Sequence, residues 1–273
     1  MNERKDIMTK TLMLTVLVCI VTAFCFAEVS VNGPLTLEQS AKSGDIYKGD
    51  IILLNTDNTQ QEVKVFLADY QFFADDRVLY NDPGSVSRSN APWITYSPKR
   101  FIIPPKSSLN VAYSVKVPGD KSLVGTYWSC IMIEGIPSES PESGKVDRKA
   151  PSITVAQVVR YAIQVMTHIG DAGKRNLKFS SSKLVLEHEK KVLSIDVENT
   201  GDYMLRAILS VELYDEKGIL AGKFPGDSFR LYPGTSKRFK TDLSAASNKK
   251  YKALVIVDCG GKNVFGVNMS LAL

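Results

Sequence analysis

Residues 151–169, PSITVAQVVRYAIQVMTHI, decide how this chain folds. Alternate positions from Ile153 to Thr167 are almost continuously apolar, as in a strand with one buried face, but several apolar side chains also share one side of a helix. Periodicity therefore leaves both structures open. Eight of the fifteen residues from Ile153 to Thr167 are β-branched, and the neighbouring segments are strand-like, so we predict a strand.

The segments around this stretch have the pattern of an all-β protein. Short β-branched and aromatic runs alternate with turn clusters at intervals of about ten residues, as in sandwiches and barrels. In 97–120, the prolines Pro98, Pro104 and Pro105 cannot donate ladder hydrogen bonds, which predicts a strand crossing between two sheets. The run GTYWSCIMIEG at 125–135 is apolar on both faces, which predicts a central strand.

Composition also indicates where the chain divides. The Pro-, Ser- and charge-rich stretch 137–152 predicts a long loop before the strand, and GDAGKRN at 170–176 predicts a hinge after it. Residues 174–273 have the length of one immunoglobulin-like sandwich. We therefore predict an all-β fold of two tandem immunoglobulin-like β-sandwich domains, 28–169 and 174–273.

The first 27 residues have the pattern of a secretory signal. A basic start precedes seventeen apolar or small residues, TLMLTVLVCIVTAFCFA, and Ala27 stands before the polar Glu28. A membrane anchor is the alternative, because the apolar run is only slightly shorter than a spanning helix. We predict a signal peptide, 1–27, and a mature protein that is periplasmic or secreted and no longer attached to a membrane.

The sequence offers little for catalysis or for metal and cofactor binding. The two histidines, His168 and His188, have no partner at metal-ligand spacing, and both are predicted to be surface residues. No nucleophile elbow or phosphate-binding loop is present in the sequence. We predict a protein that is not an enzyme and that has no metal and no cofactor.

The charges and cysteines limit the partners further. The net charge is +5, and the basic residues are scattered instead of clustered on one predicted face, so we predict no nucleic-acid binding. Beyond the signal, Cys130 and Cys259 lie in different predicted domains and in apolar runs. Export would permit a disulfide, but buried cysteines are often free, and the sequence leaves both states open.

The layout of the chain resembles that of periplasmic pilus-assembly chaperones of the PapD type. The matching parts are 35–58 (LTLEQSAKSGDIYKGDIILLNTDN), the strand–Pro-Pro–strand unit 101–117, and GTYWSCIMIEGIP at 125–137. A loop, the long apolar strand, a hinge and a second sandwich follow in the same order. The resemblance implies a protein that binds an exported or pilus-type subunit by β-strand addition.

The resemblance also implies which residues contact the partner. In that family, alternate apolar residues of the long strand enter the subunit, and the residues here that match are Ile153, Val155, Val159 and Ile163. The family anchors the subunit's C-terminal carboxylate with an Arg on the first strand and a Lys on the long strand. This sequence departs from that pattern, with Glu38 and Gln39 in the first-strand region and Arg160 on the long strand.

A second, weaker resemblance gives an alternative function. Residues 92–135 and 197–224 are also similar to the paired sandwich domains of WxL-associated bacterial cell-surface proteins. This resemblance implies a structural or adhesion protein that binds wall polymer or another surface protein.

Our principal prediction is a non-catalytic protein-binding module that lends the edge of 153–165 to an extended segment of a partner. An apolar edge of this length promotes aggregation, so we expect it to be covered by 28–40 or occupied by the partner. Trp93 is a further candidate for partner contact. The predicted partner-binding residues are therefore Ile153, Val155, Val159, Arg160, Ile163 and Trp93.

Overall fold

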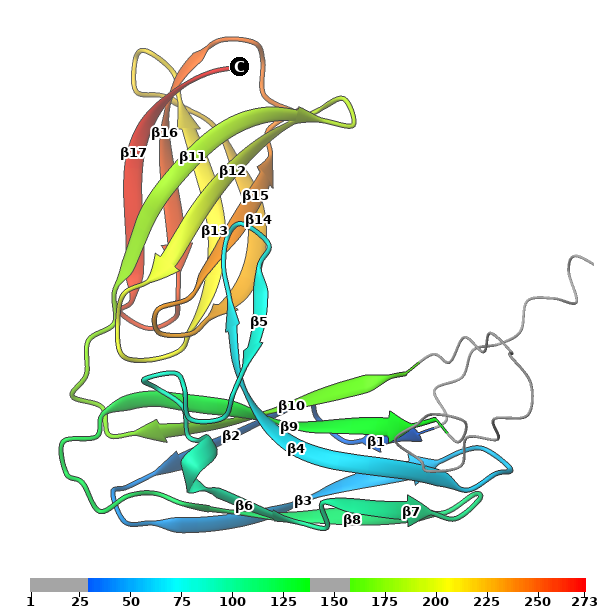
Figure 1. Cartoon of the computed structure of the whole chain (residues 1–273). Helices are drawn as coiled ribbons and strands as arrows, with labels where there is room; N and C mark the ends of the chain where they lie inside the picture. The colour runs from blue at the N-terminus through cyan, green and yellow to red at the C-terminus, as the bar shows by residue number, and fades with distance from the viewer. Residues whose placement is uncertain (1–28, 138–157) are drawn as a thin grey trace, which may run out of the picture.

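The computed structural model describes residues 29–137 and 158–273, which form two β-sandwich domains (Figure 1). Among them, one 3-10 turn, η1 (Ala91–Trp93), is the only helical element. The predicted fold of two tandem immunoglobulin-like sandwiches is confirmed. The predicted signal peptide lies outside the described residues, as do the candidates Ile153 and Val155.

The first domain packs a four-stranded sheet against a six-stranded one. Its strands are β1 (Val29–Asn32), β2 (Thr36–Ala41), β3 (Ile46–Asn55), β4 (Gln61–Phe72), β5 (Val78–Asn81), β6 (Ile94–Ser97), β7 (Arg100–Ile103), β8 (Ser108–Lys116), β9 (Gly125–Ile136) and β10 (Arg160–Ile169). The smaller sheet has the order β1-β3-β8-β6, and the larger has the order β2-β10-β9-β4-β5, with β7 paired to β4. The chain therefore changes sheets between β1 and β2.

The second domain is a seven-stranded sandwich. Its strands are β11 (Leu177–Glu187), β12 (Lys190–Asn199), β13 (Leu205–Tyr214), β14 (Leu220–Leu231), β15 (Ser236–Asp242), β16 (Lys250–Asp258) and β17 (Val264–Ala272). Their order is β11-β12-β15-β14-β13-β16-β17. The sequence DEKG (215–218) forms the turn between β13 and β14, closed by a 2.9 Å hydrogen bond from Asp215 N to Ile219 O.

The prolines mark the predicted strand crossing. Pro98 lies between β6, in the smaller sheet, and β7, in the larger one. Pro104 and Pro105 lie between β7 and β8, where the chain returns to the smaller sheet. Because proline has no N–H to place in a ladder, it is tolerated at these points where a strand ends and the chain changes sheets.

The stretch that decides the fold is a strand from Arg160 onward. β10 pairs antiparallel with β9 along its whole length, and β9 also pairs with β4, so 125–136 is the central strand that the sequence predicts. Side chains of β10 alternate between two environments. Ile163 and Val165 are buried in the core of the first domain, whereas Met166 faces the core of the second domain.

The two domains meet in an aromatic joint. Phe72 and Trp128 of the first domain belong to the same apolar cluster as the second-domain core, and Tyr232 lies between them. The ring centroid of Tyr232 is 5.3 Å from that of Phe72 and 5.0 Å from that of Trp128. The indole N–H of Trp128 donates to the Tyr70 carbonyl at 2.7 Å. The joint therefore buries aromatic area and leaves the indole satisfied.

The predicted hinge, 170–176, is held by the turn at Asp202. The backbone N–H of Asp202 donates to Lys174 O at 2.7 Å, and its carbonyl accepts from Thr126 N at 2.8 Å. Its carboxylate forms an ion pair with Arg88 of the first domain. Gly125 has a φ of +95°, and a Cβ on it would lie 2.2 Å from the Asp202 carbonyl oxygen. This close approach requires glycine.

Cys130 and Cys259, the two cysteines of the described residues, are free thiols. Cys130 is buried in β9, and Cys259 is half-buried after β16. Burial raises the pKa of the Cys130 thiol to about 12 and that of the Cys259 thiol to about 11. Both thiols therefore stay protonated near neutral pH, which makes them poor nucleophiles.

Candidate functional site

One flank of β10 is covered over only half of its length. From Gln164 to Ile169, the strand pairs parallel with β2, in register from Gln164 opposite Thr36 to Ile169 opposite Ala41. The expectation that the N-terminal segment covers the edge is confirmed for this half. Figure 1 shows β2 beside β10 in the larger sheet, with β1 in the other sheet.

The other half of the same flank is open. The N–H of Gln164 donates to Leu35 O at 2.9 Å, so the peptide groups of Gln164 face the β2 side. Because alternate residues of a strand direct their N–H and C=O groups to the same flank, those of Ala162 and Arg160 face this side too. Within the described residues, no strand pairs there, since β1 is joined to β3 instead.

Beside the open half of the flank lie two apolar side chains, Val158 and Val159, and one charged side chain, Arg160. Val158 is 45% exposed, and Val159 is partly buried. Arg160 forms an ion pair with Glu134 of β9, and its guanidinium lies 5.7 Å from the centre of the Phe66 ring. The Arg160 charge is therefore matched within the sheet, and its side chain covers an aromatic ring.

Glu134 is itself held by two cations. Its second partner is Lys64 of β4, with 2.9 Å between Lys64 Nζ and Glu134 Oε1. Partial burial raises the pKa of Glu134, but the hydrogen bonds from Lys64 and Arg160 outweigh it, so the pKa lies below the usual value. The carboxylate therefore stays ionised and fixes Arg160 beside the open flank.

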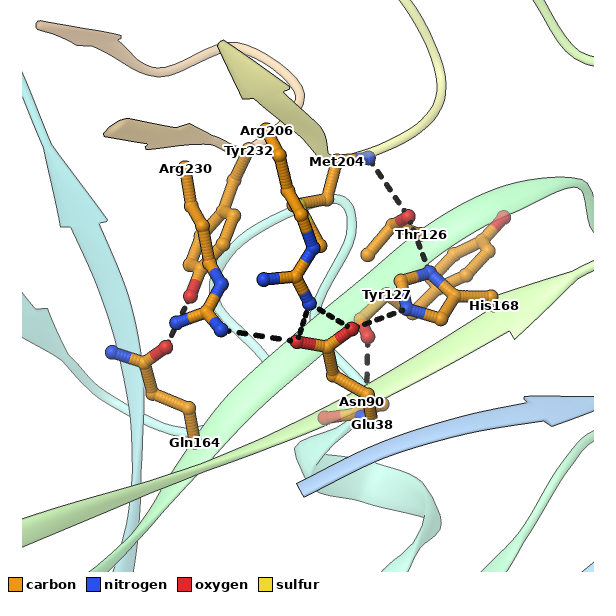
Figure 2. Close-up of polar contacts among 10 residues, drawn as sticks. All are labelled: Glu38, Asn90, Thr126, Tyr127, Gln164, His168, Met204, Arg206, Arg230 and Tyr232. Carbon is orange, nitrogen blue, oxygen red and sulfur yellow. Dashed lines mark hydrogen bonds and ion pairs between the residues drawn. The ribbon is translucent and has the colours of Figure 1, made fainter. Parts of the chain in front are cut away.

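The covered half of β10 leads into a charged cluster between the domains, shown in Figure 2. Glu38 of β2 accepts two hydrogen bonds from one nitrogen of Arg206, at 2.6 and 2.8 Å. Its carboxylate also lies 3.6 Å from Arg230 Nη2 and 3.8 Å from His168 Nε2. The arginines belong to the second domain, so this carboxylate joins β2 to the neighbouring domain.

His168 has a defined place in this cluster, although the sequence predicts a surface residue. Its Nδ1 lies 2.9 Å from the Thr126 hydroxyl oxygen, which accepts the Met204 N–H at 2.9 Å. The hydroxyl can then donate its own proton to Nδ1, which leaves the ring proton on Nε2, toward Glu38. Burial lowers the pKa of His168 even though Glu38 acts to raise it. The prediction of a plain surface histidine is wrong, because the domain joint covers the ring.

An open pocket of about 540 Å³ lies beside the cluster. Its walls combine aromatic and cationic side chains from both domains, among them Tyr70, Phe72, Tyr232, Arg206, Arg230 and Lys237. The Tyr232 hydroxyl donates to the Gln164 side chain, which ties β10 to the pocket wall. Aromatic faces and cations hold ligands by contact and charge, so the arrangement is suited to binding.

The structure places the described candidates in different roles. Ile163 is fully buried in the core of the first domain, so its side chain is committed to folding. Val159 and Arg160 lie at the start of the open flank. Trp93 is partly buried, and its ring centroid is 4.8 Å from that of Tyr127. It lies in η1, just before β6 of the smaller sheet, and so not on β10. Val159 and Arg160 are thus the candidates that the structure brings together.

Sequence reasoning missed the charged cluster. Arg206 and Arg230 are separated from Glu38 by more than 160 residues, and no motif connects them. One signal was present, because the sequence shows Glu38 where the resemblance leads one to expect a cation. Among the described residues, no group of three or more His, Cys, Asp or Glu side chains could hold a metal ion. The same residues include no helix of the length and apolarity needed to cross a membrane.

Comparison with known proteins gives similarity at the level of structure only. No family model matches the chain, and no curated protein matches it. Solved structures similar to it include the YadV chaperone (TM-score 0.43, 16% identity, 90% of this chain and 100% of that one). Another is a chaperone–tip adhesin complex of CFA/I fimbriae (TM-score 0.47, 11% identity, 89% and 98%).

A third similar structure is the SafB chaperone with the SafA pilin from Salmonella enterica (TM-score 0.43, 14% identity, 92% of this chain and 99% of that one). The resemblance to pilus-assembly chaperones noted in the sequence is thus found again among solved structures. At 11–16% identity, these similarities concern the fold.

Proposed function

We propose that this protein is an exported, non-catalytic binding module that takes up an extended segment of another exported protein by β-strand addition on β10. One observation carries the proposal: among residues 29–137 and 158–273, no strand pairs with the peptide groups of Arg160 and Ala162 on the flank that β2 covers from Gln164 onward. Such groups are a template for another strand. Export rests on the signal pattern of residues 1–27.

The geometry supports a strand partner in preference to a compact one. β2 already shows that this flank accepts a strand in parallel register. The ladder supplies affinity without regard to sequence, and the side chains next to it select the register. Ala162 packs on the sheet beside Cys130 and Met132, and exposed Val158 offers an apolar contact.

The finer identity of the partner is a proposal from the sequence resemblance. It would be the extended strand of a pilus-type subunit, met in the periplasm or outside the cell. In this proposal, Ile153 and Val155, which lie outside the described residues, contact the partner as Val159 does, while Ile163 contributes only by fixing β10 in the sheet.

The test removes one outward N–H from the open flank. Ala162→Pro deletes the N–H that faces the flank and leaves the pairing with β9 intact, whereas Ala162→Val keeps the N–H and adds bulk. Both variants, carrying an affinity tag, are incubated with the exported proteins of the cells that make this protein. The parent and the valine variant should capture the same partner, and the proline variant should lose it.

A second measurement places the partner on the flank. In the captured complex, the amides of Arg160 and Ala162 should become protected from hydrogen exchange. A partner that the proline variant binds equally well, with these amides still exchanging, contradicts strand addition. Retained binding of wall polymer by the proline variant would favour the structural or adhesion alternative.

A further inference from the structure

β2 occupies the same flank of β10 that the proposed partner would use. It covers only the half from Gln164 to Ile169, and its pairing is parallel and six residues long. By alternation, the amides of Met166 and His168 face β2, as that of Gln164 does. If β2 left the sheet, the open flank would extend from Arg160 to the end of the strand.

Burial alone holds β2 weakly. None of its residues is fully buried, and three of its six, Glu38 to Ser40, are exposed. Leu37 is its one side chain that packs against the core of the first domain, and it is only partly buried. By contrast, ten of the twelve residues of β9, on the other side of β10, are buried. Something other than apolar area must therefore contribute to keeping β2 in place.

The second domain supplies that contribution. Arg206 on β13 and Arg230 on β14 are directly opposite each other in an antiparallel pair. Like charges in this arrangement repel each other and destabilise the pair. The carboxylate of Glu38 approaches both, which offsets the repulsion and attaches β2 to β13 and β14 (Figure 2). The Glu38 side chain is 27% exposed, but those of Arg206 and Arg230 are 55% and 42% exposed, so solvent weakens these contacts.

We infer that Glu38, Arg206 and Arg230 form a latch that holds β2 on β10 and thereby limits the length of flank open to a partner. The inference rests on the proposed function for its meaning, but the latch itself is a property of the free protein. When the latch is closed, the peptide groups of Arg160 and Ala162 are available to a partner. When it is released, those of Gln164, Met166 and His168 become available too.

The experiment measures how often β2 leaves the sheet, without any partner. Amide exchange is followed residue by residue by NMR in the intact chain, the parent and Glu38→Gln. Glu212→Gln is the matched control, because Glu212 pairs with Lys223 across the same two strands at 2.6 Å and does not approach β2. Glu38→Gln should speed exchange at Gln164, Met166 and His168 by roughly three- to tenfold, the range from a surface ion pair to a charge-assisted double hydrogen bond.

Arg206→Gln provides the second line of evidence. It should speed exchange at the same three amides, and combining it with Glu38→Gln should add little, because both remove one interaction. The latch is overturned if Glu38→Gln leaves these amides unchanged, or if Glu212→Gln speeds them equally, which would indicate general loosening. Neither outcome touches the proposed function, which depends on the amides of Arg160 and Ala162.

Discussion

The two halves of β10 belong to one strand but lie in different surroundings. From Gln164 to Ile169, β9 and β2 pair on both sides, and the second domain contacts the outer face. At Arg160 and Ala162, β9 pairs on one side, and no strand of the described residues pairs on the other. The comparison teaches that an edge strand can be protected along part of its length while the remainder keeps free peptide groups.

The largest expected loss of stability comes from truncating the buried side chain of Ile163, compared with the partly exposed side chain of Val159. Ile163→Ala should lower the free energy of unfolding by about 2–5 kcal/mol, because it leaves a cavity in the first-domain core. Val159→Ala, at the partly exposed start of the strand, should cost less than about 1.5 kcal/mol. Urea unfolding measures both values. Equal losses of unfolding free energy in the two variants would contradict the placement of Ile163 inside the first-domain core and of Val159 outside it.

The covered end of β10 depends on close contact with the second domain. Gly125 pairs with Ile169, and a Cβ there would collide with the Asp202 carbonyl in a left-handed backbone. Gly125→Ala should therefore cost about 1–3 kcal/mol. Gly119→Ala, where a Cβ meets nothing within 4 Å, is the control and should be close to neutral. Thermal unfolding of the two variants decides whether this contact is as tight as described.

A pH effect should be confined to the covered half. Burial lowers the pKa of His168 below its usual 6.5, so the unfolded chain binds a proton more readily than the folded one. The stability contributed by the neutral ring is complete above about pH 6.5 and is lost as the pH falls below it. His168→Asn should lose less stability than the parent between pH 7 and 5, with both compared to their values at pH 8. Parallel curves would contradict a buried neutral ring.

The smallest effect is expected at the open half. Ala162→Pro should change the free energy of unfolding of the free protein by no more than about 0.5 kcal/mol, since no strand in the described part of the chain pairs with its N–H. Gln164→Pro should cost clearly more, because it removes both the hydrogen bond to Leu35 and the side-chain acceptor of the Tyr232 hydroxyl. Urea unfolding of these two variants tests whether the β10 flank changes from open to covered between Ala162 and Gln164. Similar losses of stability in the two variants would show that the change does not occur between these residues.

Much of the fold could be predicted because it depends on local sequence patterns. Alternation along 125–135 and the β-branched content of 153–167 predict strands, since these residues fit a pleated surface whatever their neighbours are. The prolines at 98, 104 and 105 predict the crossing between sheets because they lack a donor. The resemblance implied that Ile163 contacts the partner, whereas its side chain is buried in the first-domain core, because periodicity does not tell whether an apolar face meets the core or a partner.

The sequence by itself determined that the chain forms strands and that these strands build two successive sandwiches. Only the tertiary structure decided that β2 covers half of β10, that Glu38 meets two arginines of the other domain, and that His168 is enclosed. The physical reason is the range of the interactions. Strand formation depends on neighbours two residues away, whereas the pairing of β2 with β10 and the ion pairs of Glu38 join residues more than 100 positions apart, which no local pattern connects.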